Sequence, residues 1–143
     1  MTPMELMELA IEAREHAYVP YSGFSVGAAL VTKGGKVYQG CNIENASYTP
    51  TVCAERTAFF KAVYDGEREF QAIAVVGGRA DRPLGTEENA SGTVSAPCGV
   101  CRQVIREFCD DDFEIYLRKP NGELMTVTLA EILPLGFTKK DMA

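Results

Sequence analysis

Two short cysteine motifs constrain this chain more than any other feature. Cys53-Ala54-Glu55 forms the first motif, and Pro97-Cys98-Gly99-Val100-Cys101 forms the second. Structural zinc sites normally fill all four coordination positions with protein ligands, whereas catalytic zinc sites keep three and leave the fourth to water. Three thiols beside one carboxylate therefore predict a catalytic zinc, one per chain, with Cys53, Cys98 and Cys101 as ligands and Glu55 as the proton carrier.

Both motifs precede helical patterns, and this location suits the chemistry. Zinc binds the thiolate, and the dipole and free amides of a helix N-terminus favour that form. Cys98 and Cys101 share a helix face, whereas Cys53 and Glu55 can face one site only if the first turn of their helix points at the metal. Each motif alone is a weak signal, because a lone Pro-Cys-x-x-Cys is more often a redox or structural-zinc fragment. When both motifs occur in one chain, a zinc site is favoured, and buried structural cysteines with a surface Glu become the less favoured alternative.

The two arginines beside the motifs, the remaining cysteines and the histidine are expected to have different roles. Three thiolates leave a zinc site negatively charged, so a neighbouring cation must offset that charge, and both Arg56 and Arg102 adjoin the motifs. Arg56 is the stronger candidate to donate hydrogen bonds to the sulfurs, whereas a solvated charge is the favoured interpretation of Arg102. Cys41 and Cys109 lack companion residues and are predicted to be small buried hydrophobes. His16, the one histidine, lies far from the motifs, which disfavours Ser-His and Cys-His mechanisms.

Composition and charge limit the class of protein. The 143 residues are predicted to form a single domain, 1–143, with its own core. A net charge of −6 disfavours binding to a nucleic acid polymer and favours a small neutral substrate. No apolar stretch is long enough to span a membrane, and the opening residues lack a secretory signal. Five cysteines, an odd number, suit free or metal-bound thiols, so a cytoplasmic location is expected.

Periodicity and turn signals predict alternating helices and strands. Helices are expected at about 3–17, 52–64 and 98–108, and a short one from the capping-box sequence that begins at Thr128. Strands are expected at 24–31, 36–40, 70–76, 113–118 and 124–128, the first two forming a hairpin. The apolar run 70–76 is typical of a strand covered on both faces, and 79–96 is predicted to be a long loop. This order predicts an α/β fold, a three-layer α/β/α sandwich with a mixed sheet.

Longer segments around the motifs resemble the cytidine deaminase family, in its small homotetrameric form with three cysteine zinc ligands. The resemblance covers nearly the whole chain and is carried by Tyr21 to Ala29, Gly40 to Tyr48, Thr51 to Arg56 and Pro97 to Gln103. It implies a cytidine deaminase-like fold, hydrolytic deamination of cytidine and deoxycytidine in pyrimidine salvage, and a homotetramer with shared active sites. In that reaction zinc activates water, and Glu55 serves as base and then as acid.

The resemblance also implies which residues bind the nucleoside. The binding segment would consist of Asn42, Ile43, Glu44, Asn45, Ala46, Ser47 and Tyr48, with Asn42 and Glu44 holding the ribose hydroxyls. Phe24 would pack near the substrate, Ala54 would contact the base through its backbone, and Phe137 would close a neighbouring subunit's pocket. From the residues alone, the asparagines could instead satisfy turn backbone, and the three aromatic residues Phe24, Tyr48 and Phe137 could belong to the core.

Three alternatives stay open from the sequence. Related enzymes deaminate other cytosine-bearing substrates such as blasticidin S. Asn42 and Glu44 argue against such a substrate, because they lie in a segment that resembles the nucleoside-binding segment of the family. Polynucleotide editing is disfavoured by the acidic balance and the lack of a basic stripe. The third alternative is not an enzyme: it is a zinc module whose metal only supports the fold, and in it Glu55 is an incidental surface acid. The 79–96 loop is longer than in smaller members of the family, which leaves the pocket rim and subunit contacts open.

Overall fold

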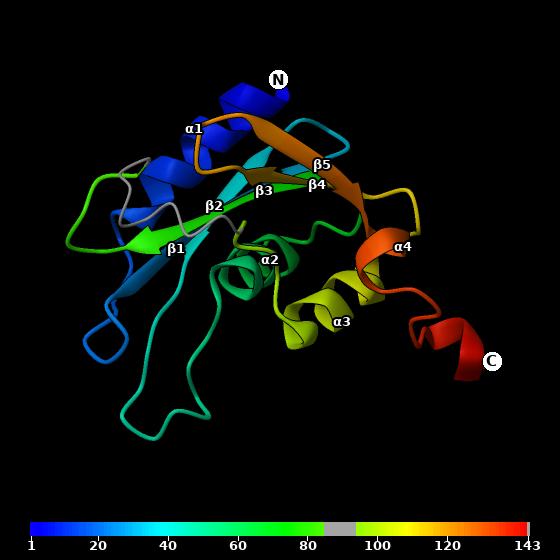
Figure 1. The fold of residues 1–143 in the computed structure, drawn as a ribbon. Coiled ribbons are helices and arrows are strands. Elements are labelled where there is room, and N and C mark those ends of the chain that lie inside the picture. The colour runs from blue at the N-terminus through cyan, green and yellow to red at the C-terminus, as the bar shows by residue number, and fades with distance from the viewer. Residues whose placement is uncertain (85–93, 143) are drawn as a thin grey trace.

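The computed structural model describes residues 1–84 and 94–142 and places one mixed sheet between two layers of helices (Figure 1). The strands lie in the order β2-β1-β3-β4-β5, and every neighbouring pair is antiparallel except β3 and β4. The predicted three-layer α/β/α sandwich is thereby confirmed. The elements in chain order are α1 (Pro3–Arg14), β1 (Phe24–Thr32), β2 (Val37–Cys41), α2 (Ala54–Tyr64), β3 (Phe70–Arg79), α3 (Gly99–Phe108), β4 (Glu114–Arg118), β5 (Leu124–Thr128), α4 (Leu129–Ile132) and the 3₁₀ helix η1 (Lys139–Met142).

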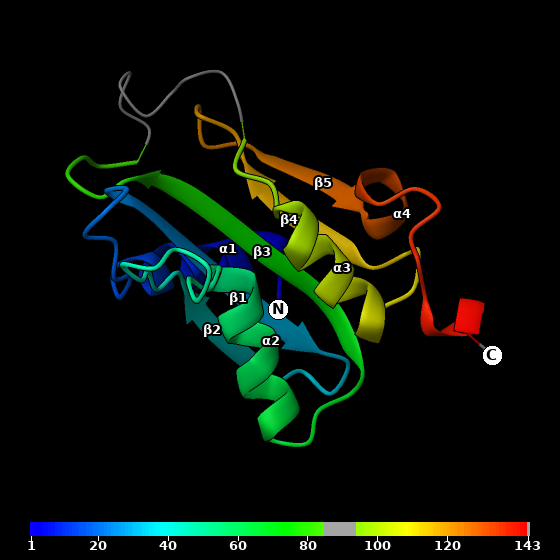
Figure 2. The same cartoon turned by 90° about the horizontal axis from the view of Figure 1, so that it is seen from below.

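The helices cover opposite faces of the sheet, as Figure 2 shows: α1 lies on one face, and α2 and α3 lie on the other. Neighbouring strand residues alternate between the two faces, so that Ala74 packs with Leu6 of α1 while Ile73 packs with Phe59 of α2 and Ile105 of α3. The prediction that 70–76 is covered on both faces is therefore confirmed. Within the described residues, no helix combines the length and the apolar character needed to cross a membrane.

Two element ends differ from the sequence prediction by three residues, each for a local reason, and the other ends differ by two residues at most. The first helix stops at Arg14 because Tyr18 must be extended: its N–H donates to Asn42 O at 3.0 Å, and its carbonyl accepts from the Glu44 N–H at 2.9 Å. The third strand continues past Val76 to Arg79 because Gly77 and Gly78 keep their pairing with β1. The middle of the predicted 79–96 loop, residues 85–93, lies outside the described residues.

A glycine on β2 sets how closely α2 approaches the sheet. A Cβ atom at Gly40 would lie 2.3 Å from Ala54 O and 2.6 Å from Ala58 N, both backbone atoms of α2. Gly40→Ala is therefore expected to lower the free energy of unfolding by about 1–3 kcal/mol, the usual cost of overpacking, as measured by urea denaturation. Gly34→Ala is the control, since a Cβ there meets only Thr32 Oγ1 at 3.7 Å. Equal stability of the two variants would contradict the packing argument.

Candidate active site

The two cysteine motifs meet where α2 and α3 begin. The sulfurs of Cys53, Cys98 and Cys101 all lie within 4.8 Å of one another, and those of Cys53 and Cys98 are 3.7 Å apart. Cys53 and Cys98 are the N-cap residues of the two helices, and Cys101 lies buried in the first turn of α3. Cys41 and Cys109 are not part of this cluster; Cys109 is buried as predicted, whereas Cys41 is only half-buried.

The three sulfurs fit a zinc ion. Two sulfurs on a tetrahedral zinc, each about 2.3 Å from the metal, would lie roughly 3.8 Å apart, close to the 3.7 Å between Cys53 and Cys98. Hydrogen bonding from Cys101, with further donors Arg56 and Cys98, lowers the pKa of Cys53 to about 5, while the pKa of Cys101 is raised. The lowered pKa favours the thiolate form of Cys53, which is the form that binds a divalent cation.

Arg56 contacts the cluster in the way that the sequence predicted. Its Nη2 atom lies 3.6 Å from Cys53 Sγ and donates to Thr51 O at 3.3 Å. A guanidinium at this distance offsets part of the negative charge of the thiolates. Arg102 differs from its favoured interpretation as a solvated charge, because its side chain is partly buried and donates to the carbonyls of Pro97 and Ile132.

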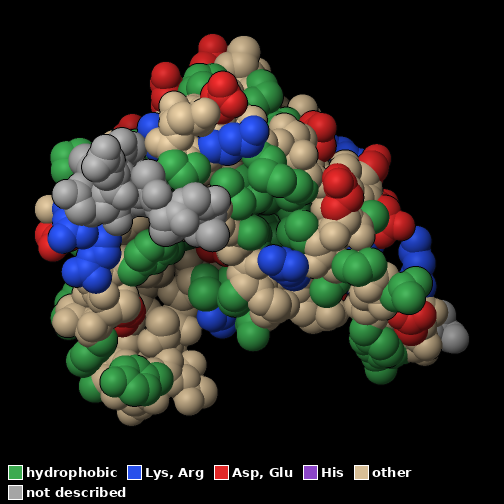
Figure 3. Space-filling model, in the orientation of Figure 1, with side chains coloured by type: hydrophobic (Ala, Val, Ile, Leu, Met, Phe, Trp, Pro, Cys, Tyr) green, Lys and Arg blue, Asp and Glu red, His purple; other side chains and the backbone are tan. Residues whose placement is uncertain are grey.

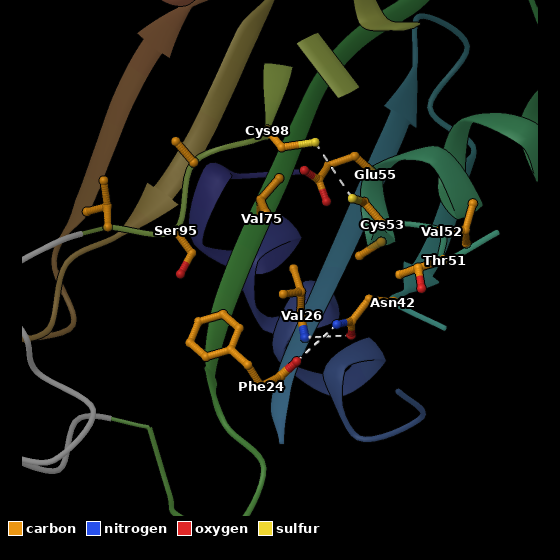
Figure 4. Close-up of a pocket in the computed structure, with 13 residues that line it drawn as sticks. Phe24, Val26, Asn42, Thr51, Val52, Cys53, Glu55, Val75, Ser95 and Cys98 are labelled. Carbon is orange, nitrogen blue, oxygen red and sulfur yellow. Dashed lines mark hydrogen bonds between the residues drawn. The ribbon is translucent and has the colours of Figure 1, made fainter. Parts of the chain in front are cut away.

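Glu55 lies in the first turn of α2 and is only 4 % exposed. Figure 4 shows its carboxylate beside the sulfurs of Cys53 and Cys98. Burial, together with the charge on Cys53, raises the pKa of Glu55 to about 7. A carboxyl that titrates near neutral pH can accept and return a proton during a reaction. The alternative of an incidental surface acid does not agree with this burial.

A pocket of about 330 Å³ opens in front of Glu55 and the cysteines (Figure 4). Phe24 forms one wall, where its ring has room because Gly77 lacks a side chain: a Cβ there would lie 2.7 Å from Phe24 Cε1. Six lining residues were candidates from the sequence: Phe24, Asn42, Cys53, Ala54, Glu55 and Cys98. Seven were missed: Val26, Thr51, Val52, Val75, Val94, Ser95 and Ala96. The period of a strand could have found Val26, two residues from Phe24 on the same face.

Asn42 connects the pocket to the start of β1. Its Oδ1 accepts from the Val26 N–H, and its Nδ2 donates to Phe24 O, each at 2.9 Å (Figure 4). The carboxamide therefore holds the backbone that carries the Phe24 ring. It keeps one further N–H and one further lone pair for a ligand.

Glu44 lies in a neighbouring hollow of about 390 Å³, which Tyr48 and Thr51 also line. Its carboxylate accepts from the backbone N–H groups of Tyr21 at 3.0 Å and Ser22 at 3.1 Å, and from the Ser22 hydroxyl. The hydroxyl bond above all lowers the pKa of Glu44, so the carboxylate is ionised at neutral pH. Thr51 lines both this hollow and the pocket in front of Glu55.

The other predicted substrate-binding residues lie outside the pocket. Ile43 bridges to Tyr18 and Val52 and lines an open groove beside α2. Asn45 accepts a hydrogen bond from the Ser47 N–H in an exposed turn that also contains Ala46. Tyr48 is 72 % exposed with φ 64°, and Phe137 is 58 % exposed, so neither belongs to the core of its own chain.

Comparisons with known proteins agree with this geometry. The family model described as the cytidine and deoxycytidylate deaminase zinc-binding region matches residues 2–117. The chain is 52 % identical to a cytidine deaminase of Sporosarcina psychrophila over 132 residues, 92 % of this chain and 88 % of the relative. The crystal structure of cytidine deaminase from Burkholderia pseudomallei superposes with a TM-score of 0.83 at 47 % identity and covers 96 % of this chain and 100 % of that one. A blasticidin-S deaminase of Bacillus cereus is 35 % identical over 136 residues, 95 % of this chain and 92 % of the relative.

Proposed function

The chain belongs to the cytidine and deoxycytidylate deaminase family, as a deaminase with one zinc per chain, and from this we propose that it converts both cytidine and deoxycytidine to their uridine products by zinc-dependent hydrolysis. The observation that carries the proposal is the buried carboxyl of Glu55 beside three cysteine sulfurs at the end of a pocket. The reaction would serve pyrimidine salvage. Free and metal-bound thiols persist most readily in a reducing compartment, which supports a cytoplasmic location.

Glu55 moves the protons of the reaction. Cys53, Cys98 and Cys101 would hold the zinc, which when bound activates a water molecule for attack on C4 of the cytosine ring. Glu55 accepts a proton from this water and delivers it to ring nitrogen N3, which makes C4 electrophilic. It then carries the second proton to the amino group, so that ammonia leaves and C4 keeps the oxygen of water as a carbonyl. A pKa near 7 allows the same carboxyl to act as base and as acid.

A neutral nucleoside suits the rest of the site better than a nucleotide. Asn42 lines the pocket, and Glu44 lies in the adjoining hollow, so that we assign both to the ribose hydroxyls. The Glu44 carboxylate is ionised and would repel a phosphate group placed against it. The base would lie along Phe24, with its edge at the backbone of Ala54.

Neighbouring subunits would complete this site in a homotetramer. Tyr48 and Phe137 are exposed, and both lie on segments that project from the same side of the molecule in Figure 3, with hydrophobic side chains at their tips. Ile43, Phe60 and Tyr64 line an open groove beside α2 that a second copy would cover. Light scattering on the purified protein is expected to give four times the chain mass of 15.6 kDa. A monomer with full activity would remove the shared-site proposal.

Ser22 links the two ends of the proposed nucleoside site. Its hydroxyl donates to Glu44 and accepts from the Phe24 N–H at 3.0 Å. Ser22→Ala is expected to raise KM for cytidine by up to about tenfold, with a smaller change in kcat, because the Glu44 carboxylate loses a hydrogen bond of about 1.5–3 kcal/mol that fixes its position. Steady-state kinetics measure both. Ser22→Thr keeps the hydroxyl and should restore most of the affinity, and an unchanged KM in Ser22→Ala would argue against Glu44 as a substrate ligand.

The proposed function is tested directly by ultraviolet absorbance. Purified protein with one zinc per chain should deplete the absorbance of cytidine and of deoxycytidine, with release of one ammonia per nucleoside. Turnover of cytidine alone would narrow the substrate range. Absence of turnover for both nucleosides at full zinc content would overturn the proposal.

A second candidate substrate is another cytosine-bearing compound, blasticidin S. The similarity to a blasticidin-S deaminase favours it, although the identity of 35 % is lower than the 52 % shared with a cytidine deaminase. Ammonia release from cytidine and from blasticidin S, measured side by side, separates the two. Turnover of blasticidin S alone would make it the substrate in place of the nucleosides.

A further inference from the structure

Arg102 of α3 holds the backbone on both sides of the ligand Cys98. Its side-chain Nε donates to Pro97 O at 2.7 Å, directly before Cys98 in the chain. Its backbone N–H donates to Cys98 O at 2.9 Å. One residue therefore fixes the two carbonyl groups that flank this cysteine. Because these peptide planes define φ and ψ at Cys98, they also define the direction of the Cα–Cβ bond from which its sulfur extends.

Cys98 has few other constraints of its own. It is exposed, whereas Cys101 is fully buried, and as N-cap of α3 its side chain makes no capping hydrogen bond. Pro97 anchors the preceding peptide by burial of its ring, but proline has no N–H to add a hydrogen bond. Pro97 can therefore form a backbone hydrogen bond only through its carbonyl, and the Arg102 guanidinium donates to this carbonyl.

The same guanidinium extends this contact to the C-terminal segment. Its Nη1 donates to Ile132 O at 2.7 Å, the last carbonyl of α4, which would otherwise lack a helical partner. The next residue, Gln103, donates through Nε2 to Phe137 O at 2.9 Å. Arg102 therefore connects the loop before Cys98 with α4, and Gln103 connects the same turn of α3 with the C-terminal segment.

We propose that Arg102 is a positioning residue for the metal, which holds Cys98 ready to bind zinc and couples that ligand to the C-terminal segment. The role needs the planar fork of arginine, whose Nε and Nη1 reach two carbonyls at once in fixed directions. A lysine would keep the positive charge but offers a single flexible ammonium. A charge role and a positioning role are therefore separable by one substitution.

The test compares zinc affinity in Arg102→Lys and Arg106→Lys, with competition by a coloured zinc chelator as the readout. Arg102→Lys is expected to weaken zinc binding by about 10- to 100-fold, the usual effect of losing a group that orients a metal ligand. Arg106→Lys is the matched control, since Arg106 lies one turn further along α3, has a side chain only 8 % exposed and donates to Asp111 at 2.7 Å. Its zinc affinity should equal that of the wild type.

Wild-type zinc affinity in a folded Arg102→Lys protein would overturn the proposal, as would an equal loss in both variants. Circular dichroism of the zinc-free proteins reports folding, and Arg102→Gln, which also removes the fork, replaces the lysine variant if that variant does not fold. The readout does not depend on the substrate. An inactive wild type would count against the proposed deamination alone, whereas an active wild type with tight zinc in Arg102→Lys would count against the positioning role alone.

Discussion

Replacing Glu55 with Gln is expected to lower kcat for cytidine by about 10²- to 10⁴-fold, the contribution typical of a positioned general acid–base. Glutamine has nearly the same shape but can neither accept a proton from water nor return one to N3 or to the leaving amino group. Glu55 is not one of the three clustered sulfur ligands, so zinc should stay at one per chain. Absorbance kinetics and metal analysis on the same samples measure both quantities.

Glu107→Gln is the matched control for this substitution, because Glu107 lies exposed on α3 and outside the pocket lining. Its kcat should equal that of the wild type. Appreciable turnover by Glu55→Gln at full zinc content would remove Glu55 from the proton-transfer role. Loss of zinc in the same variant would instead indicate that the carboxylate helps to hold the metal.

The arrangement of layers could be predicted from the sequence because each element carries a local signal. The capping box at Thr128 begins α4 as expected, and the unbroken apolar run after Phe70 matches a strand buried on both faces. The errors arose where long-range pairing prevailed over local preference. The predicted strand ended at Val76, before two glycines, yet pairing with β1 keeps Gly77 and Gly78 in the sheet.

The cysteine cluster and its contact with Arg56 were also predictable, whereas the contacts of Ser22 and Arg102 were not. Cysteine and glutamate at the motif spacing predict the three-sulfur cluster and a carboxyl beside it without knowledge of the fold. Ser22 carries no local signal, because its role depends on Glu44, which a different segment brings to it. Arg102 was interpreted as a surface charge for the same reason, since its partner Ile132 lies in the C-terminal part of the chain.

Cys101→Ala is expected to weaken zinc binding by more than about 100-fold, beyond the effect of losing an orienting group, and to remove cytidine turnover with it. The substitution leaves two of the three clustered sulfurs, and Cys53 loses the partner that lowers its pKa most. Chelator competition measures the affinity, and activity is expected to follow the bound zinc.

Cys109→Ala separates loss of a ligand from loss of packing. Cys109 directly follows α3 and is 8 % exposed, against 0 % for Cys101, so both substitutions remove one sulfur from a buried position near the same helix. Burial raises the pKa of Cys109 to about 12, and its thiol is therefore neutral at pH 7, the opposite of the thiolate that zinc requires. Cys109→Ala should lose stability but keep wild-type zinc affinity and turnover. If Cys101→Ala bound zinc as tightly as Cys109→Ala, Cys101 would not be a ligand, and the metal would have to be held by Cys53 and Cys98 with a different third group.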